Sequence, residues 1–243
     1  MYKKLSAHKN IFWIFILLVI ASAISVILAG IRMQRSDSMR YAFLLWNLML
    51  AWIPFLLAIL AYASANARKR ILYLVIFVSA VAWLLFFPNA PYILTDFQHL
   101  NRVADGIPVW YDVVLIIWFA WTALLLGMVS LYLMQEIVAR MFGKVTSWLF
   151  VIGVTTLSSF GVYVGRFLRW NSWDAWKNPL PLALDIWDQV RHPLANKDAF
   201  IFTIIFTLLF LFIYVTLVLV GNLTVERQMQ QLGVTQKTKT ASH

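Results

Sequence analysis

Six stretches of the chain are apolar over almost their whole length, and this pattern restricts the folds open to it. They cover residues 11–31, 41–63, 71–87, 111–135, 146–165 and 199–222. Each stretch has about 17–25 residues, the length that a helix needs to cross a bilayer. Because an open chain satisfies its backbone polar groups in lipid by forming helices, the sequence predicts an all-α, polytopic membrane protein. Its six transmembrane helices form a single integral membrane domain, residues 1–243.

The composition supports this interpretation and narrows the function classes. Hydrophobic residues make up 62% of the chain and charged residues 12%, whereas soluble globular domains have about 45–50% and about 25%. The chain has no cysteine, which excludes disulfides and thiolate metal sites. Outside the spans, the sequence leaves outer loops at 88–110 and 166–198 and a polar tail at 223–243, so we expect no separate soluble domain.

The first apolar stretch leaves an alternative open. It follows three lysines and contains the small residues Ala21 and Ala23, a pattern that also fits a cleaved signal peptide. The apolar run continues to Leu28, however, which makes it long enough for an uncleaved span. We therefore interpret it as the first transmembrane helix.

The distribution of charge predicts the orientation of the spans. Six spans place both termini on one side, and that side holds 11 of the 20 Lys and Arg residues, including Arg68, Lys69 and Arg70. Basic residues in short loops favour the cytoplasmic side, so we expect both termini in the cytoplasm. In such a chain the net charge of +10 favours membrane lipids over nucleic acid as partners.

Polar residues occur at four span ends that face the same side. Asn47 lies near the start of the second span, and Asn89 follows the third. Tyr111 and Asp112 open the fourth span, and Arg166 closes the fifth. Polar groups at membrane depth usually face the interior of the bundle and find partners there. We therefore expect a polar and aromatic cavity that opens to the outer face.

The segment after the third span combines helix breakers with titratable residues. Pro88 predicts a break in the helix, and Thr95 followed by Gln98 predicts a capping box that opens a short helix. Asp96 and His99 then share one helical face.

Two interpretations of Asp96 and His99 remain open. An Asp and a His at this spacing suit a proton relay or part of a metal site, for which Asp105 or Asp112 would have to supply a further ligand. The alternative is a carboxylate near a helix N-terminus beside a surface histidine. We expect no metal and no cofactor.

The segment 161–174 joins small residues to arginines and aromatic rings. Gly161 and Gly165 are four residues apart, which favours close helix packing. Arg166 and Arg169 can hold a phosphate or carboxylate, because guanidinium forms a bidentate fork and stacks on rings. The structural alternative is an ion pair between Arg166 and Asp112. Further on, residues 182–191 have an imperfect amphipathic pattern, which predicts a helix along the outer interface, as a passive connector or a lid.

Four long strings resemble a known family. They are FLLWNLMLAWIP (43–54), FFPNAPYILTD (86–96), WYD (110–112) and GRFLRWNSWD (165–174). They are similar to the bacterial integral membrane proteins grouped as domain of unknown function 1361, over about residues 40–220. The resemblance implies a multi-pass protein of the bacterial cytoplasmic membrane and no particular reaction, so no residue role is carried over from it.

These observations predict a binder or envelope enzyme that acts on a lipid or lipid-linked anionic substrate. Asp96, His99 and Asp112 are the candidate catalytic residues. The candidate ligand-binding residues are Asn47, Asn89, Tyr92, Tyr111, Arg166, Arg169, Trp170, Asn171, Trp173 and Asp174. A noncatalytic assembly or regulatory subunit and a small-solute transporter are the alternatives. An intramembrane aspartyl or zinc protease is disfavoured, because the chain has no GxGD or HExxH motif.

Overall fold

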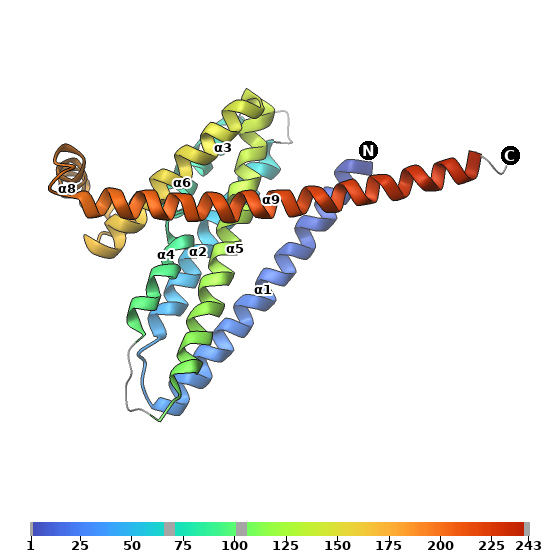
Figure 1. Ribbon diagram of the computed structural model, residues 1–243. Coiled ribbons are helices and arrows are strands. Elements are labelled where there is room, and N and C mark those ends of the chain that lie inside the picture. Colours follow the sequence, from blue (N-terminus) through green and yellow to red (C-terminus); the bar gives the residue numbers. More distant parts are fainter. Residues whose placement is uncertain (1, 66–70, 101–105, 241–243) are drawn as a thin grey trace.

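The computed structural model describes residues 2–65, 71–100 and 106–240, and these ranges contain helices and no strand (Figure 1). The elements are α1 (Tyr2–Ser36), α2 (Ala42–Ala65), α3 (Ile71–Phe86), α4 (Asn89–Tyr92), the 3-10 helix η1 (Ile93–His99), α5 (Val109–Phe142), α6 (Lys144–Phe167), α7 (Asp174–Lys177), α8 (Pro179–Arg191) and α9 (Lys197–Thr240). The prediction of an all-α chain is confirmed.

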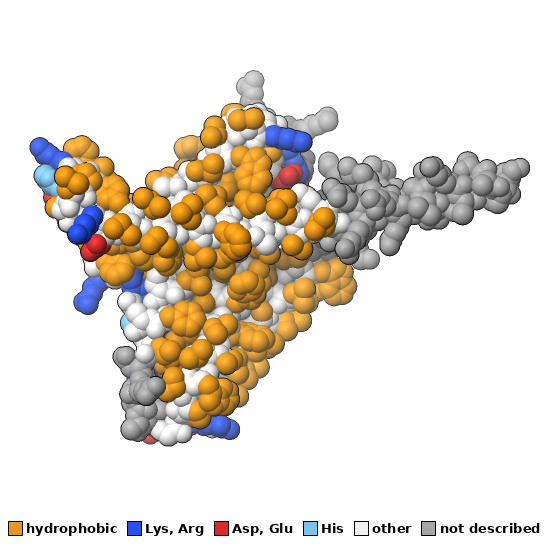
Figure 2. Space-filling view, viewed as in Figure 1, with side chains coloured by type: hydrophobic (Ala, Val, Ile, Leu, Met, Phe, Trp, Pro, Cys, Tyr) orange, Lys and Arg blue, Asp and Glu red, His pale blue; other side chains and the backbone are white. Residues whose placement is uncertain are grey.

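Six helical segments are long and apolar enough to cross a membrane. They are Ile11–Ser36, Ala42–Ala65, Leu74–His99, Val109–Phe142, Lys144–Phe167 and Lys197–Leu223. Hydrophobic side chains also cover much of the surface seen in Figure 2. Leu208 and Phe212 of α9, for example, are 62% and 70% exposed. A soluble protein rarely exposes so much apolar surface, but a bilayer covers it. The chain is therefore a multi-pass membrane protein, and the predicted number of spans is confirmed.

The helix α5 forms the centre of the bundle. It packs against α1, α2 and α6, while α2 also packs against α3. Leu115, Phe119 and Ala123 of α5 are almost completely buried in one apolar cluster. The helix α9 lies against α6, and Phe202 of α9 contacts the rings of Tyr163 and Phe167 there. The long spans thus provide a rigid frame for the shorter elements.

The third span is longer than its apolar stretch suggests. The helix breaks at Pro88, as expected, but the chain continues as α4 and η1 rather than as an outer loop. A proline is tolerated in the first turn of a helix, where its missing N–H has no partner in any case. The helix therefore restarts next to the break. The capping box at Thr95 is not formed, because η1 already begins at Ile93 and Thr95 lies inside it, where its hydroxyl donates to the carbonyl of Tyr92 at 2.7 Å.

Glycines let α4 approach α5 and α6 closely. A Cβ atom on Gly161 would lie 2.9 Å from Pro88 Cγ, and one on Gly127 would lie 2.9 Å from Ala90 Cβ. A Cβ on Gly165 would lie 3.2 Å from the ring of Tyr92. The close packing predicted at Gly161 and Gly165 is thus present, and α4 is the partner. This contact fixes the segment that carries the polar residues of the third span.

The connection between α6 and α9 contains α7 and the amphipathic α8. The predicted helix at 182–191 is present, and it begins earlier, at Pro179. Leu180, Leu184 and Trp187 are 69%, 58% and 59% exposed on its outer side. This surface suits an interfacial helix.

Candidate functional site

A polar cavity of about 450 Å³ lies where the α1–α2 turn, α2, α4, η1 and α6 meet. It is lined by Arg40, Phe43, Asn47, Tyr92, Asp96, His99 and Arg166. Five of these were predicted from the sequence as site residues: Asn47, Tyr92, Asp96, His99 and Arg166. Depth and parity place them on one side of the membrane, and packing brings them together.

A buried ion pair forms the floor of this polar cavity. Arg166 donates to Asp96, which has no exposed surface. The other carboxylate oxygen of Asp96 accepts from Asn47 Nδ2 at 3.0 Å, and Arg166 Nε donates to the Thr95 hydroxyl at 2.6 Å. A buried charge needs a partner and additional hydrogen bonds. Both charged groups here meet that requirement.

The guanidinium of Arg166 is engaged on several sides. Its Cζ lies 4.1 Å from the centre of the Tyr92 ring. Its Nη1 lies 3.0 Å from His99 Nε2, and the amide oxygen of Gln98, oriented to accept, lies 2.7 Å from the same atom. Since a guanidinium only donates hydrogen bonds, Nε2 of His99 is the accepting nitrogen and the ring proton lies on Nδ1. His99 is therefore a neutral side chain that can donate from Nδ1.

Arg40 is a cavity residue that the sequence analysis missed. Its Nη2 lies 3.4 Å from the backbone oxygen of His99, and no carboxylate of the described chain lies within ion-pair distance of it. Arg40 precedes α2 by two residues, in the turn after α1. That position lies outside the apolar spans, where polar residues attract attention. The signal that marks it is a basic residue directly beside a span end, on the same side as the other cavity residues.

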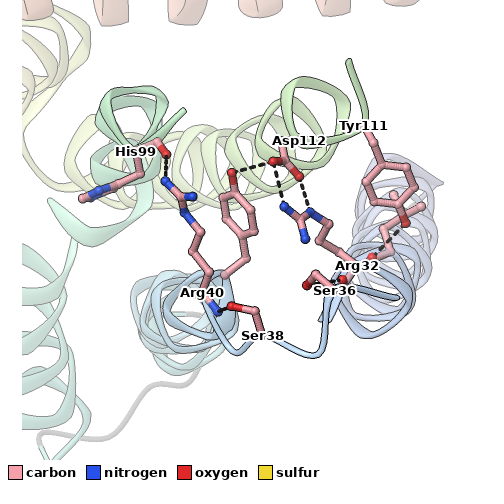
Figure 3. A network of polar contacts seen from close by, with 9 residues as sticks. Arg32, Ser36, Ser38, Arg40, His99, Tyr111 and Asp112 are labelled. Atoms are coloured by element: carbon pink, nitrogen blue, oxygen red, sulfur yellow. Dashed lines mark hydrogen bonds and ion pairs between the residues drawn. The ribbon is translucent and has the colours of Figure 1, made fainter. Parts of the chain in front are cut away.

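Asp112 belongs to a second network, drawn in Figure 3, and does not line the polar cavity. Its carboxylate accepts two hydrogen bonds from Arg32, one of them from Nη2 at 3.1 Å, and a third from the Tyr41 hydroxyl at 2.9 Å. Arg32 and Asp112 are 2% and 5% exposed. The predicted pairing of Arg166 with Asp112 is therefore wrong. Asp112 pairs with Arg32. Arg32 lies one residue beyond the first apolar stretch but still within α1, which extends to Ser36.

The same network keeps the Tyr41 hydroxyl protonated. Burial, the hydrogen bond to Asp112 and the charge of that carboxylate together raise the pKa of Tyr41 to about 12. Burial disfavours the phenolate, and a neighbouring negative charge does so too. Tyr41 therefore acts as a hydrogen-bond donor to Asp112 throughout the physiological pH range.

An apolar cavity of about 600 Å³ adjoins the polar one, and Asn47 and Tyr92 line both. Its other walls include Leu50, Leu84, Pro88 and Val164, and α8 contributes Leu182 and Ile186. Four further predicted residues line it: Asn89, Trp170, Asn171 and Trp173. The rings of Trp46 and Trp173 meet edge to face at 6.2 Å. A polar and an apolar compartment thus share a wall.

Comparison with known proteins identifies the family. Residues 46–213, more than half of the chain, match the family model described as Protein of unknown function (DUF1361). The chain belongs to the DUF1361 family. This confirms the resemblance found in the sequence. No curated protein and no solved structure matches this DUF1361 protein.

The remaining predicted residues of the DUF1361 protein line neither of the two cavities. Tyr111 donates to the backbone oxygen of Leu28 at 2.9 Å and ties α5 to α1. Arg169 is exposed and follows Leu168, the C-cap of α6, with a φ of +62°. The backbone N–H of Asn171 donates to Asp174 at 2.8 Å and holds the pKa of that carboxyl below its usual range. These positions shape the frame of the site.

The metal hypothesis for Asp96 and His99 gains no further ligand from the described ranges of this DUF1361 protein. No three His, Asp or Glu side chains there are arranged to hold an ion. Asp112 is engaged by Arg32, and Asp105 lies outside the described residues. The geometry of the polar cavity instead provides guanidinium and imidazole donors, which suit an anion.

Proposed function

We propose that this DUF1361 protein binds an amphiphile with an anionic head, either a lipid or a lipid-linked compound. The head occupies the polar cavity and the hydrocarbon chain occupies the apolar one. The observation that carries the proposal is the wall that the two cavities share through Asn47 and Tyr92. A ligand with a charged head and an apolar chain matches both compartments at once.

The charges of the polar cavity support an anionic head. Arg40, Arg166 and Asp96 together give it a charge of +1, because His99 is neutral. Arg166 is held by Asp96, Thr95 and the ring of Tyr92, so Arg40 is the cation that can turn to a ligand. Guanidinium recognises phosphate and carboxylate through parallel N–H donors. His99 Nδ1 adds a neutral donor.

The hydrogen bonds of Asp96 and His99 favour binding of the ligand over its chemical modification. Both oxygens of Asp96 accept hydrogen bonds, and the group has no exposed surface. His99 Nε2 accepts from Arg166. A general base needs a free acceptor within reach of the proton that it takes. Asp96 and His99 are instead occupied in holding the polar cavity together, and Asp112 does not line it.

The apolar cavity supports a ligand from the bilayer rather than a small solute. Burial of a hydrocarbon chain against its aliphatic and aromatic walls stabilises the complex by about 25 cal/mol for each Å² of apolar surface buried. A small polar anion has no such surface to bury. Basic residues on the side of the termini favour a cytoplasmic location for both ends. The cavities then open at the outer face of the membrane, and the family resemblance favours a bacterial cytoplasmic membrane.

A binding measurement with matched ligands tests this function. The purified protein in phosphatidylcholine nanodiscs is titrated with dodecyl phosphate, inorganic phosphate and dodecanol, and empty nanodiscs are the control. We expect dodecyl phosphate to bind at least about tenfold more tightly than either partial ligand, because only it fills both cavities. Equal affinity for inorganic phosphate would indicate a small-anion site. Absence of binding by all three ligands would favour a noncatalytic assembly or regulatory subunit.

A further inference from the structure

One carboxylate holds both ends of the turn that carries Arg40. Arg32 lies near the end of α1, and Tyr41 directly precedes α2. Asp112 of α5 accepts hydrogen bonds from both. Arg40 lies between these two anchors in the chain. Figure 3 shows Asp112 facing Arg32, with Arg40 reaching from the same turn toward His99.

Few hydrogen bonds within the turn hold its backbone, and the shortest runs from the N–H of Ala42 to the carbonyl of Met39 at 3.0 Å. Asp37 adopts a φ of +48°, a left-handed conformation that an aspartate tolerates but does not prefer. The N–H of Arg40 donates to the Ser38 hydroxyl at 3.3 Å, a long hydrogen bond. These hydrogen bonds hold the backbone and do not fix the long side chain of Arg40. The position of Arg40 therefore depends on the anchors at the two ends.

Tyr41 connects the anchor to Arg40 directly. The guanidinium of Arg40 lies 5.8 Å from the centre of the Tyr41 ring, and that of Arg32 lies 5.2 Å from it. The ring has 1% exposure, and its hydroxyl is bonded to Asp112. That hydrogen bond orients the ring over which the guanidinium of Arg40 lies. The ring of Tyr41 and the guanidinium of Arg40 are thus coupled to Asp112, a carboxylate that does not line the polar cavity.

We propose that Asp112 is a positioning residue, which clamps the α1–α2 turn so that Arg40 meets the anionic head of the ligand. This inference rests on the proposed function, and it assigns to Asp112 no contact with the ligand. A purely structural ion pair would stabilise α1 against α5 without affecting the affinity for the head. The two roles differ in whether the effect of Asp112 on binding passes through Arg40.

A double-mutant cycle measures that dependence. The dissociation constant for dodecyl phosphate is measured in phosphatidylcholine nanodiscs for wild type, Tyr41→Phe, Arg40→Gln and the double variant. Tyr41→Phe keeps the ring and the Arg32–Asp112 pair, so the chain still folds. We expect Arg40→Gln to weaken binding by about tenfold or more and Tyr41→Phe by about threefold to tenfold. In the Arg40→Gln background, Tyr41→Phe should have no further effect.

Tyr214→Phe is the matched control. The Tyr214 hydroxyl donates to Gln135 of α5 and is buried like that of Tyr41. Gln135 lies about 34 Å from Asp112 along the helix, at 1.5 Å per residue. Removal of this hydroxyl should lower the melting temperature to a similar extent and leave the dissociation constant unchanged. Asp112→Asn, assayed where it accumulates in the membrane, should weaken binding at least as much as Tyr41→Phe.

Each outcome separates this inference from the proposed function. The positioning role would be overturned if the fold-changes in dissociation constant of the two single variants multiply in the double variant. It would also be overturned if Tyr41→Phe leaves the dissociation constant unchanged. Either result leaves the anion site intact. Tight binding by wild type with no loss in Arg40→Gln would overturn the role of Arg40 and the positioning inference together. If wild type does not bind dodecyl phosphate, the proposed function fails and the inference fails with it.

Discussion

Asp96 and Arg166 are 70 residues apart in the sequence and form a buried ion pair, with side-chain exposures of 0% and 7%. Asp96 lies on the restarted helix after Pro88, and Arg166 lies at the end of α6. The pair joins two elements that the glycines of α6 already hold in close contact.

Arg40→Gln should weaken the binding of dodecyl phosphate by about tenfold to a hundredfold, because a hydrogen bond to a charged group contributes about 1.5–3 kcal/mol. Its abundance in the membrane should equal that of wild type, since Arg40 pairs with no carboxylate of the described chain. Arg35→Gln, at an exposed position of α1, is the control and should bind normally. Equal losses in both variants would indicate a general effect of surface charge.

Leu84→Trp should narrow the apolar cavity and weaken the binding of dodecyl phosphate several-fold, because each buried methylene contributes about 0.8 kcal/mol. Leu84 lines that cavity and is 37% exposed, so a larger side chain can be accommodated. Affinity for inorganic phosphate should not change. Leu74→Trp, on the same helix and 63% exposed, is the matched control, and an equal loss there would argue against a chain-binding cavity.

Gly161→Ala should lower stability by about 1–3 kcal/mol, as overpacking in a tight contact does. The added Cβ would lie 2.9 Å from Pro88 Cγ, so α4 must shift. Gly153→Ala on the same helix meets nothing within 4 Å and should be neutral or slightly stabilising. Melting temperatures in detergent compare the two variants. Equal melting temperatures would show that α4 is not held tightly against α6.

Arg32→Met should reduce abundance in the membrane strongly, because removal of one partner of a buried pair costs about 3–5 kcal/mol. The double variant Arg32→Met, Asp112→Leu leaves no unpaired buried charge and should recover most of that loss. Immunoblots of membrane fractions measure this recovery. A double variant as scarce as the single one would show that the two charges do not act as a pair.

The sequence was sufficient to predict the number of spans and to group the polar residues at span ends that face the same side. Apolar length identifies a transmembrane helix, and parity places Asn47, Asp96 and Arg166 at the same side. Which of these side chains meet depends on how each helix is rotated, and rotation is decided by packing. The contact of Tyr92 with Gly165 is such a packing detail, and it turns Tyr92 beneath Arg166.

The pairing of charges was the part that the sequence could not predict. Asp112 and Arg166 both lie at span ends on one side, and no spacing rule distinguishes their partners. Arg32 was passed over because the apolar stretch ends at position 31, although helix α1 continues to Ser36. Apolar length marks the part of a helix that lipid covers and says little about where the helix itself ends.

Arg40 lies before residue 46, where the match to the DUF1361 family begins, whereas the walls of the apolar cavity lie within the matched range. In the proposed complex, the contact of Arg40 with the head therefore lies outside the matched range, and the contacts with the hydrocarbon chain lie within it. A change of charge in the short turn between α1 and α2 would alter the preference for one head group over another and leave the hydrocarbon pocket as it is. Under the proposed function, exchange of a few residues outside the helical framework would change the selectivity among amphiphiles.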